Sequence, residues 1–272
     1  MKLPRILFSL APLLFLGHSA SAFLITFGSS ADYDSNFYEP TGAFPGGTVW
    51  NGAGYLEHNG AASTAMYSPG STGAPTTGAG GGMEGTTPSF GVGTRIKADF
   101  STSAVNGGNS FGFYVNVGPG ENTGYAVLFQ FPNSDGKTAD FRVFESNSDP
   151  SAAGVSSTQL GSTLFFTTTG SFTGNTFYTY QLDLIQNGSN LQFVASLYTT
   201  GGTQIGSTLT ITDTTSPVLS GEIGLRLNAA NAAPSSNVRA DNFSVEAIPE
   251  PASAGLLAVS GLGLGLTLRR RR

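Results

Sequence analysis

The sequence predicts an all-β fold, an antiparallel β-sandwich or jelly roll, flanked by a signal-peptide helix at the N-terminus and a transmembrane helix at the C-terminus. Three observations indicate this. Short segments of alternating apolar and polar residues recur through the second half of the chain, separated by glycine- or asparagine-containing turns. Phe, Tyr and Thr, which favour strands, are frequent in these segments. Between the two ends, no stretch has the 3.6-residue apolar period of an amphipathic helix.

The first 22 residues have the three parts of a secretory signal peptide. Lys2 and Arg5 supply positive charge, residues 6–16 are apolar, and Ala20 and Ala22 supply the small residues of a cleavage site. We expect signal peptidase to cut after Ala22, so that the rest of the chain is exported.

The chain ends in an uncharged segment followed by a basic cluster. Residues 252–268 carry no charge and are rich in Leu, Gly and Ala, at the short limit of length for crossing a bilayer. The last four residues, Arg269, Arg270, Arg271 and Arg272, are expected to stay in the cytoplasm, because basic residues accumulate on that side. We therefore expect a transmembrane helix that holds an outward-facing domain at the membrane.

The C-terminal segment 248–272 resembles the PEP-CTERM sorting domain. Pro249, Glu250 and Pro251 precede the apolar segment and the arginines, in the order that the family has. The prolines prevent regular helix here, so the backbone is extended and accessible to a protease. Ile248 stands where Val is commoner, and an ordinary tail anchor is the alternative.

That resemblance implies recognition by an exosortase, a membrane-embedded cysteine protease of Gram-negative bacteria. It also implies an inner-membrane-anchored intermediate, a final location at the cell surface or in the extracellular matrix, and an association with exopolysaccharide or biofilm production. After cleavage near the Pro-Glu-Pro motif, the resemblance implies either release of the protein or its re-attachment at the surface.

Residues 23–247 are long enough for one large β domain. With six basic and sixteen acidic residues, the segment 23–248 has a formal charge of −10, against −5 for the whole chain. Such a field opposes binding to nucleic acid and to anionic lipid, and it favours cations. The chain has no cysteine, which excludes disulfides, thiol catalysis and thiolate metal sites, and His58 is the only histidine after the signal peptide.

The predicted strands, in chain order, are 24–27, 94–100, 110–117, 125–131, 140–145, 178–184, 191–198, 205–211, 222–228 and 238–247. Asn187-Gly188 predicts a hairpin, because both residues tolerate positive φ, and Gly201-Gly202 predicts the next turn. The three strands around these turns should form a meander.

Residues 68–93 differ from the rest, with nine glycines and three prolines in 26 residues. They cannot bury enough apolar surface to offset their ordering entropy as a core element, so we expect a long surface loop.

The stretch 178–245 resembles concanavalin A-like and laminin-G-like jelly rolls. The residues that carry the resemblance are the Asn187-Gly188 hairpin, the sequence GEIGLR at 221–226 and the sequence DNFSV at 241–245. The resemblance implies a sandwich whose last strand lies beside the first.

No catalytic arrangement stands out, and we expect the protein not to be an enzyme. Ser110 lies in a GxSxG pattern, but a predicted strand follows it where a nucleophile elbow needs a helix. Asp140 and Glu145 are five residues apart and should face opposite sides of a strand. A glycoside-active enzyme would need a carboxylate pair from distant segments.

Two kinds of binding site are hypotheses. If the first and last strands pair, oxygen ligands from Asp32, Asp34, Asp241 and Asn242 could converge on Ca²⁺, and solvated turn acids are the alternative.

Exposed aromatic rings could instead stack on sugars, and Trp50 and Tyr55 are the candidates, with packing in the core as the alternative. The leading hypothesis is a structural or adhesive surface protein. The second is a lectin-like module that binds polysaccharide, with or without calcium.

Overall fold

The computed structural model describes residues 22–29, 32, 35–38, 49–50, 54–58, 63–67, 89–103, 109–118, 123–130, 136–146, 157–229 and 237–248. Ala20, Asp34, residues 68–88 and the whole sorting segment from Pro249 to Arg272 lie outside these residues. No helix in the described part of the chain is long and apolar enough to span a membrane.

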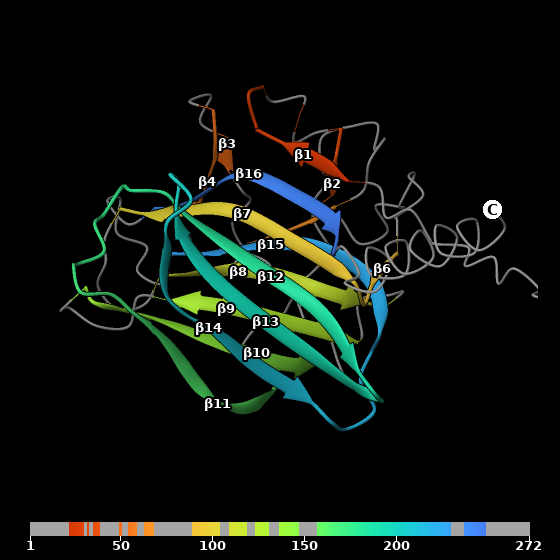
Figure 1. The fold of residues 1–272 in the computed structure, drawn as a ribbon. Helices are drawn as coiled ribbons and strands as arrows, with labels where there is room; N and C mark the ends of the chain where they lie inside the picture. Colours follow the sequence, from red (N-terminus) through yellow and green to blue (C-terminus); the bar gives the residue numbers. More distant parts are fainter. Residues whose placement is uncertain are drawn as a thin grey trace, which may run out of the picture.

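The described residues form two antiparallel sheets packed face to face, which confirms the predicted all-β class (Figure 1). Sheet A has the order β14–β13–β12–β7–β16–β4–β3, with β1 also paired to β16. Its strands are β14 (Gln204–Asp213), β13 (Asn190–Thr199), β12 (Tyr178–Asn187), β7 (Thr94–Thr102), β16 (Val238–Ala247), β4 (Leu56–His58), β3 (Val49–Trp50) and β1 (Phe23–Ile25).

Sheet B has the order β11–β10–β9–β8–β15–β5–β2, with β6 also paired to β15. Its strands are β11 (Ser157–Thr167), β10 (Thr138–Ser146), β9 (Gly124–Gln130), β8 (Ser110–Val117), β15 (Ser220–Asn228), β5 (Ser63–Tyr67), β2 (Phe37–Tyr38) and β6 (Phe90–Gly91). β11 and β14, the edge strands of the two sheets, lie next to each other at the lower side of Figure 1.

The two sheets enclose an aromatic core. Every second residue of the long strands points inward, so that both inner faces contribute to one hydrophobic cluster. Tyr180 of sheet A has its ring centroid 4.4 Å from that of Phe129 and 4.9 Å from that of Phe111, both in sheet B. Aromatic pairs at such distances stabilise the sandwich beyond simple area burial.

The first and last strands pair, as the jelly-roll resemblance implied. β1 runs antiparallel to β16, with Phe23 opposite Val245 and Ile25 opposite Phe243. The meander β12–β13–β14 is also as predicted. At its first turn, Asn187 pairs with Asn190 and only Gly188 has positive φ, at +65°. The two loop residues are therefore Gly188 and Ser189, one position later than predicted.

The structure adds strands that the alternation pattern did not predict, namely β2 to β6 and β11. Most of β2 to β6 are two or three residues long, too short to show a period. Part of the predicted loop 68–93 is described, and there Phe90 is buried and pairs with Gly221 of β15.

Candidate ligand-binding face

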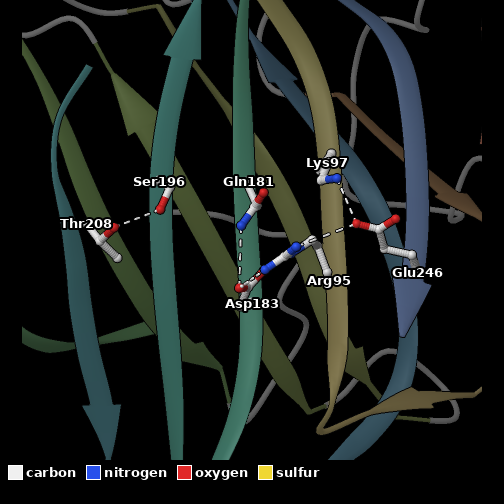
Figure 2. A network of polar contacts seen from close by, with 7 residues as sticks. All are labelled: Arg95, Lys97, Gln181, Asp183, Ser196, Thr208 and Glu246. Carbon is white, nitrogen blue, oxygen red and sulfur yellow. Dashed lines mark hydrogen bonds and ion pairs between the residues drawn. The ribbon is translucent and has the colours of Figure 1, made fainter. Parts of the chain in front are cut away.

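Each sheet has an outer face, formed by the residues that alternate with the core positions. On sheet A this face carries a network of paired charges (Figure 2). Arg95 donates from Nε to Asp183 Oδ1 at 2.7 Å and from Nη2 to Asp183 Oδ2 at 2.8 Å. Glu246 lies 2.7 Å from Lys97 Nζ and 3.8 Å from Arg95 Nη1.

The network joins the strands of sheet A without leaving a charge unpaired. Gln181 donates to Asp183 at 3.4 Å, and the hydroxyls of Ser196 and Thr208 lie 3.0 Å apart between β13 and β14 (Figure 2). The hydrogen bonds that Arg95 donates to Asp183 raise the pKa of Arg95, because they favour the charged guanidinium. Each charge of this network therefore has a partner within the network, as on a structural surface.

The candidate calcium residues are only partly brought together. Asp241 lies opposite Asp99 in the pairing of β16 with β7, and Asn242 donates from Nδ2 to Asp99 Oδ2 at 2.8 Å. Asp32 Oδ2 instead accepts from the backbone N–H of Ser29 at 2.8 Å. The described residues contain no group of three or more acidic or histidine side chains placed to hold a metal ion. Asn242 presents its amide nitrogen, not its oxygen, to Asp99, and Asp34 lies outside the described residues. Calcium binding by these residues stays a prediction.

Asp241 is destabilising when ionised. Burial raises its pKa to about 6, and the charge of Asp99 adds to the increase. Between about pH 4 and about pH 6, the folded state keeps the Asp241 proton that the unfolded state loses. The free energy of unfolding therefore falls as pH rises through this range.

We expect Asp241→Asn to raise the free energy of unfolding by about 1 kcal/mol at pH 7.5, discounted for solvent screening of a half-buried group. The amide oxygen still accepts from the backbone N–H of Asn242, which now donates at 2.7 Å. At pH 4 the variant and the parent should melt together. Thermal melts at both pH values measure this, and an equal gain at pH 4 would show that the repulsion is not the cause.

The candidate sugar-stacking residues have structural partners or lie outside what is described. Tyr55 is half-buried, its ring centroid 5.8 Å from that of Phe177 and 5.1 Å from the guanidinium carbon of Arg239. The backbone of Trp50 belongs to β3 and pairs with Leu56. The side chain of Trp50 is not among the described parts.

The outer face of sheet B carries a second group of polar side chains, on strands that the fold brings together. Gln130 of β9 lies between Asp140 of β10 and Ser110 of β8 in the register. In the neighbouring row, Leu128 of β9 and Gly112 of β8 lie between Arg142 of β10 and Arg226 of β15. We call Asp140, Arg142, Gln130, Ser110 and Arg226 the polar row.

Side-chain contacts link the members of the polar row in two separate groups. Arg142 donates to Gln130 Oε1 and lies 3.3 Å from Asp140 Oδ2. Arg226 donates from Nη1 to the Ser110 hydroxyl at 2.8 Å. Arg142 is 23% exposed at its side chain, so the row reaches solvent on the β10 side.

The polar row is incompletely satisfied. Asp140 Oδ1, Arg142 Nε and Arg226 Nε are buried and have no hydrogen-bond partner. None of the charged side chains of the sheet A network has such an atom. An unpaired buried polar atom costs about 1–3 kcal/mol, so the row is the place in the described structure where added hydrogen bonds would gain most.

An apolar cluster adjoins the polar row on the same face. Tyr114, Val117, Ala126 and Leu128 are buried there, and Phe144 packs against them. Burial raises the pKa of Asp140 to about 6, while Arg142 opposes the shift. A face that combines apolar area with a few convergent polar groups has the composition of ligand sites.

The structure does not assemble a carboxylate pair on this face from Asp140 and Glu145. Phe141 and Val143 belong to the core, so Asp140 faces outward. Glu145 is on the opposite side of β10, where burial and then the charge of Asp213 raise its pKa. Asp213 belongs to β14 of sheet A and accepts a hydrogen bond from Tyr125 at 2.6 Å.

The polar row was missed in the sequence, and Ser110 was considered only as a nucleophile. The members come from four strands, so no local motif joins them. A signal was present, however, because Arg226 interrupts the apolar run GEIGLRLN and Arg142 interrupts DFRVFE. A cation within a strand that is otherwise apolar has to be paired or functional.

No family model and no curated protein matches this chain. Similar solved structures include the carbohydrate-binding module CBM66 from Bacillus subtilis, at 10% identity over 71% of this chain and 86% of the module, with a TM-score of 0.41. The winged bean acidic lectin, solved with methyl-α-D-galactose, has 10% identity over 85% of this chain and 99% of the lectin, with a TM-score of 0.44. Lectin I from Ulex europaeus, solved with the methyl glycoside of α-L-fucose, has 12% identity over 83% and 96%, with a TM-score of 0.45. What these proteins bind is a property of their own side chains.

Proposed function

We propose that this protein is a non-enzymatic, carbohydrate-binding β-sandwich and that the outer face of sheet B is its binding face. The observation that carries the proposal is the polar row, with its three buried and unpartnered atoms. Two are donors, Arg142 Nε and Arg226 Nε, and one is an acceptor, Asp140 Oδ1. A sugar hydroxyl both donates and accepts, so a saccharide can satisfy both kinds of atom.

The apolar cluster supports the same choice of ligand. Sugar rings present C–H faces as well as hydroxyls, and Leu128 and Phe144 lie beside the polar atoms of Arg142 in the register of β9 and β10. Such a mixture of apolar contact and oriented hydrogen bonds is typical of small-molecule sites.

The cellular location of the protein is also part of the proposal. The signal peptide, the apolar segment 252–268 and the Pro249-Glu250-Pro251 motif support export, processing by an exosortase and display at the cell surface or in the matrix of a Gram-negative bacterium. A module displayed there would meet exopolysaccharide.

A structural or adhesive role without a soluble ligand is the second candidate. The self-satisfied network on sheet A favours it, because paired charges hold the strands together without needing a partner. Either function is compatible with calcium binding, and the same experiment tests whether glycan binding depends on calcium.

The test is binding of the purified full-length chain, in mild detergent, to a panel of bacterial and algal polysaccharides, with calcium and with chelator. Saturable binding to one class of glycan is expected. Absence of saturable binding to every polymer, in both conditions, would leave the structural role in its place.

A further inference from the structure

Arg226 differs from the other basic residues of the exported segment. Arg95, Lys97, Arg142 and Arg239 each make an ion pair. Arg226 is 3% exposed, yet within the described structure it has no ion-pair partner, and its one hydrogen bond goes to the neutral hydroxyl of Ser110. The remaining basic residue, Lys137, is exposed.

A buried guanidinium without an anion is costly. Arginine does not deprotonate in proteins, so Arg226 cannot escape the cost of burial by losing its charge. Asp140 does not relieve it, because that carboxylate is paired with Arg142. Among the described residues, the site therefore has one uncompensated positive charge.

One edge of the Arg226 guanidinium carries a donor that has no hydrogen-bond partner and is buried. Nη1 donates to Ser110, and Nε has no partner. Nε and Nη2 form the edge that a carboxylate binds with two parallel hydrogen bonds. On β8 the residue opposite Arg226 is Gly112, so no side chain occupies the neighbouring position on that side, while on β5 the residue opposite is Thr64.

We infer that Arg226 binds the carboxylate of an acidic sugar, so that the proposed carbohydrate ligand is a uronate-bearing polysaccharide. This inference rests on the proposed function. The whole chain has a formal charge of −5, so its overall field repels a polyanion and cannot explain such binding. Recognition depends instead on one buried cation, whose ion pair is screened little by salt.

The experiment compares polygalacturonate with its methyl ester, which keeps the sugar and removes the charge. Binding of both to the full-length chain is measured by affinity electrophoresis, together with a neutral galactan. We expect polygalacturonate to bind at least tenfold more tightly than the ester. Arg226→Gln should abolish that preference. Lys97→Gln, which removes one positive charge from sheet A, should retain it.

The outcomes separate the inference from the proposed function. Equal binding of polygalacturonate and its ester overturns the inference while the proposed function stands. Lack of binding to all three polymers and to the wider panel overturns both. If Arg226→Gln does not fold, the comparison of polygalacturonate with its ester on the parent chain still tests whether the carboxylate is recognised. Preference lost equally in Lys97→Gln would show a general charge effect and would also overturn the assignment to Arg226.

Discussion

Phe129→Ala is expected to lower the free energy of unfolding by about 3–5 kcal/mol. The side chain is fully buried at the centre of the aromatic core. Its ring lies against five others from both sheets, at centroid distances of 4.4–6.3 Å: Phe111, Phe113, Phe141, Phe166 and Tyr180. Alanine leaves a cavity between two sheets that are too firmly packed to collapse into it.

The measurement is chemical denaturation of the variant beside Phe165→Ala. Phe165 is 48% exposed on β11, so its loss should change stability by less than about 1 kcal/mol. Similar losses for the two variants would mean that the described core does not hold the sandwich together.

Gly112→Ala should destabilise the protein by more than about 3 kcal/mol, although it adds one methyl group. Gly112 has φ of +156°, and a Cβ there would lie 1.9 Å from the carbonyl oxygen of Val127. A backbone oxygen of the neighbouring strand cannot move aside without breaking the pairing of β8 with β9. The variant is therefore expected to open this pairing or to fail to fold.

Gly170→Ala is the control for Gly112→Ala. A Cβ at Gly170 would meet nothing within 4 Å, so the expected change in stability is within about 0.5 kcal/mol. Circular dichroism melts of both variants give the comparison. A stable, cooperatively melting Gly112→Ala protein would contradict the register of β8 and β9 on which the polar row depends.

The long strands could be predicted because each has one face in the core and so shows a period of two. β8 and β16 have the predicted bounds, and β12 to β14 form the predicted meander. β11 was not predicted because it is an edge strand with polar and glycine positions, and Gly161 interrupts it with φ of +62°. The short strands β2 to β4 are held by pairing with longer strands, which the local sequence does not reveal.

The candidate site could not be predicted in the same way. Ser110 and Arg226 are 116 residues apart and meet only because β8 pairs with β15. Sequence reasoning instead favoured Asp32 with Asp241, from the correct expectation that the first and last strands pair. Pairing of the backbones did not put the two carboxylates in one described cluster, since β16 turns Asp241 toward Asp99 of β7.

The most direct test of the central claim is whether glycan binding belongs to sheet B. Gln130→Ala removes a half-buried member of the polar row, and Gln192→Ala removes a half-buried glutamine from the outer face of sheet A. Binding of each full-length variant to the best polysaccharide of the panel is compared with the parent. We predict at least a fivefold loss of affinity for Gln130→Ala, about 1 kcal/mol, and none for Gln192→Ala. Loss confined to Gln192→Ala would contradict the assignment and move the site to sheet A.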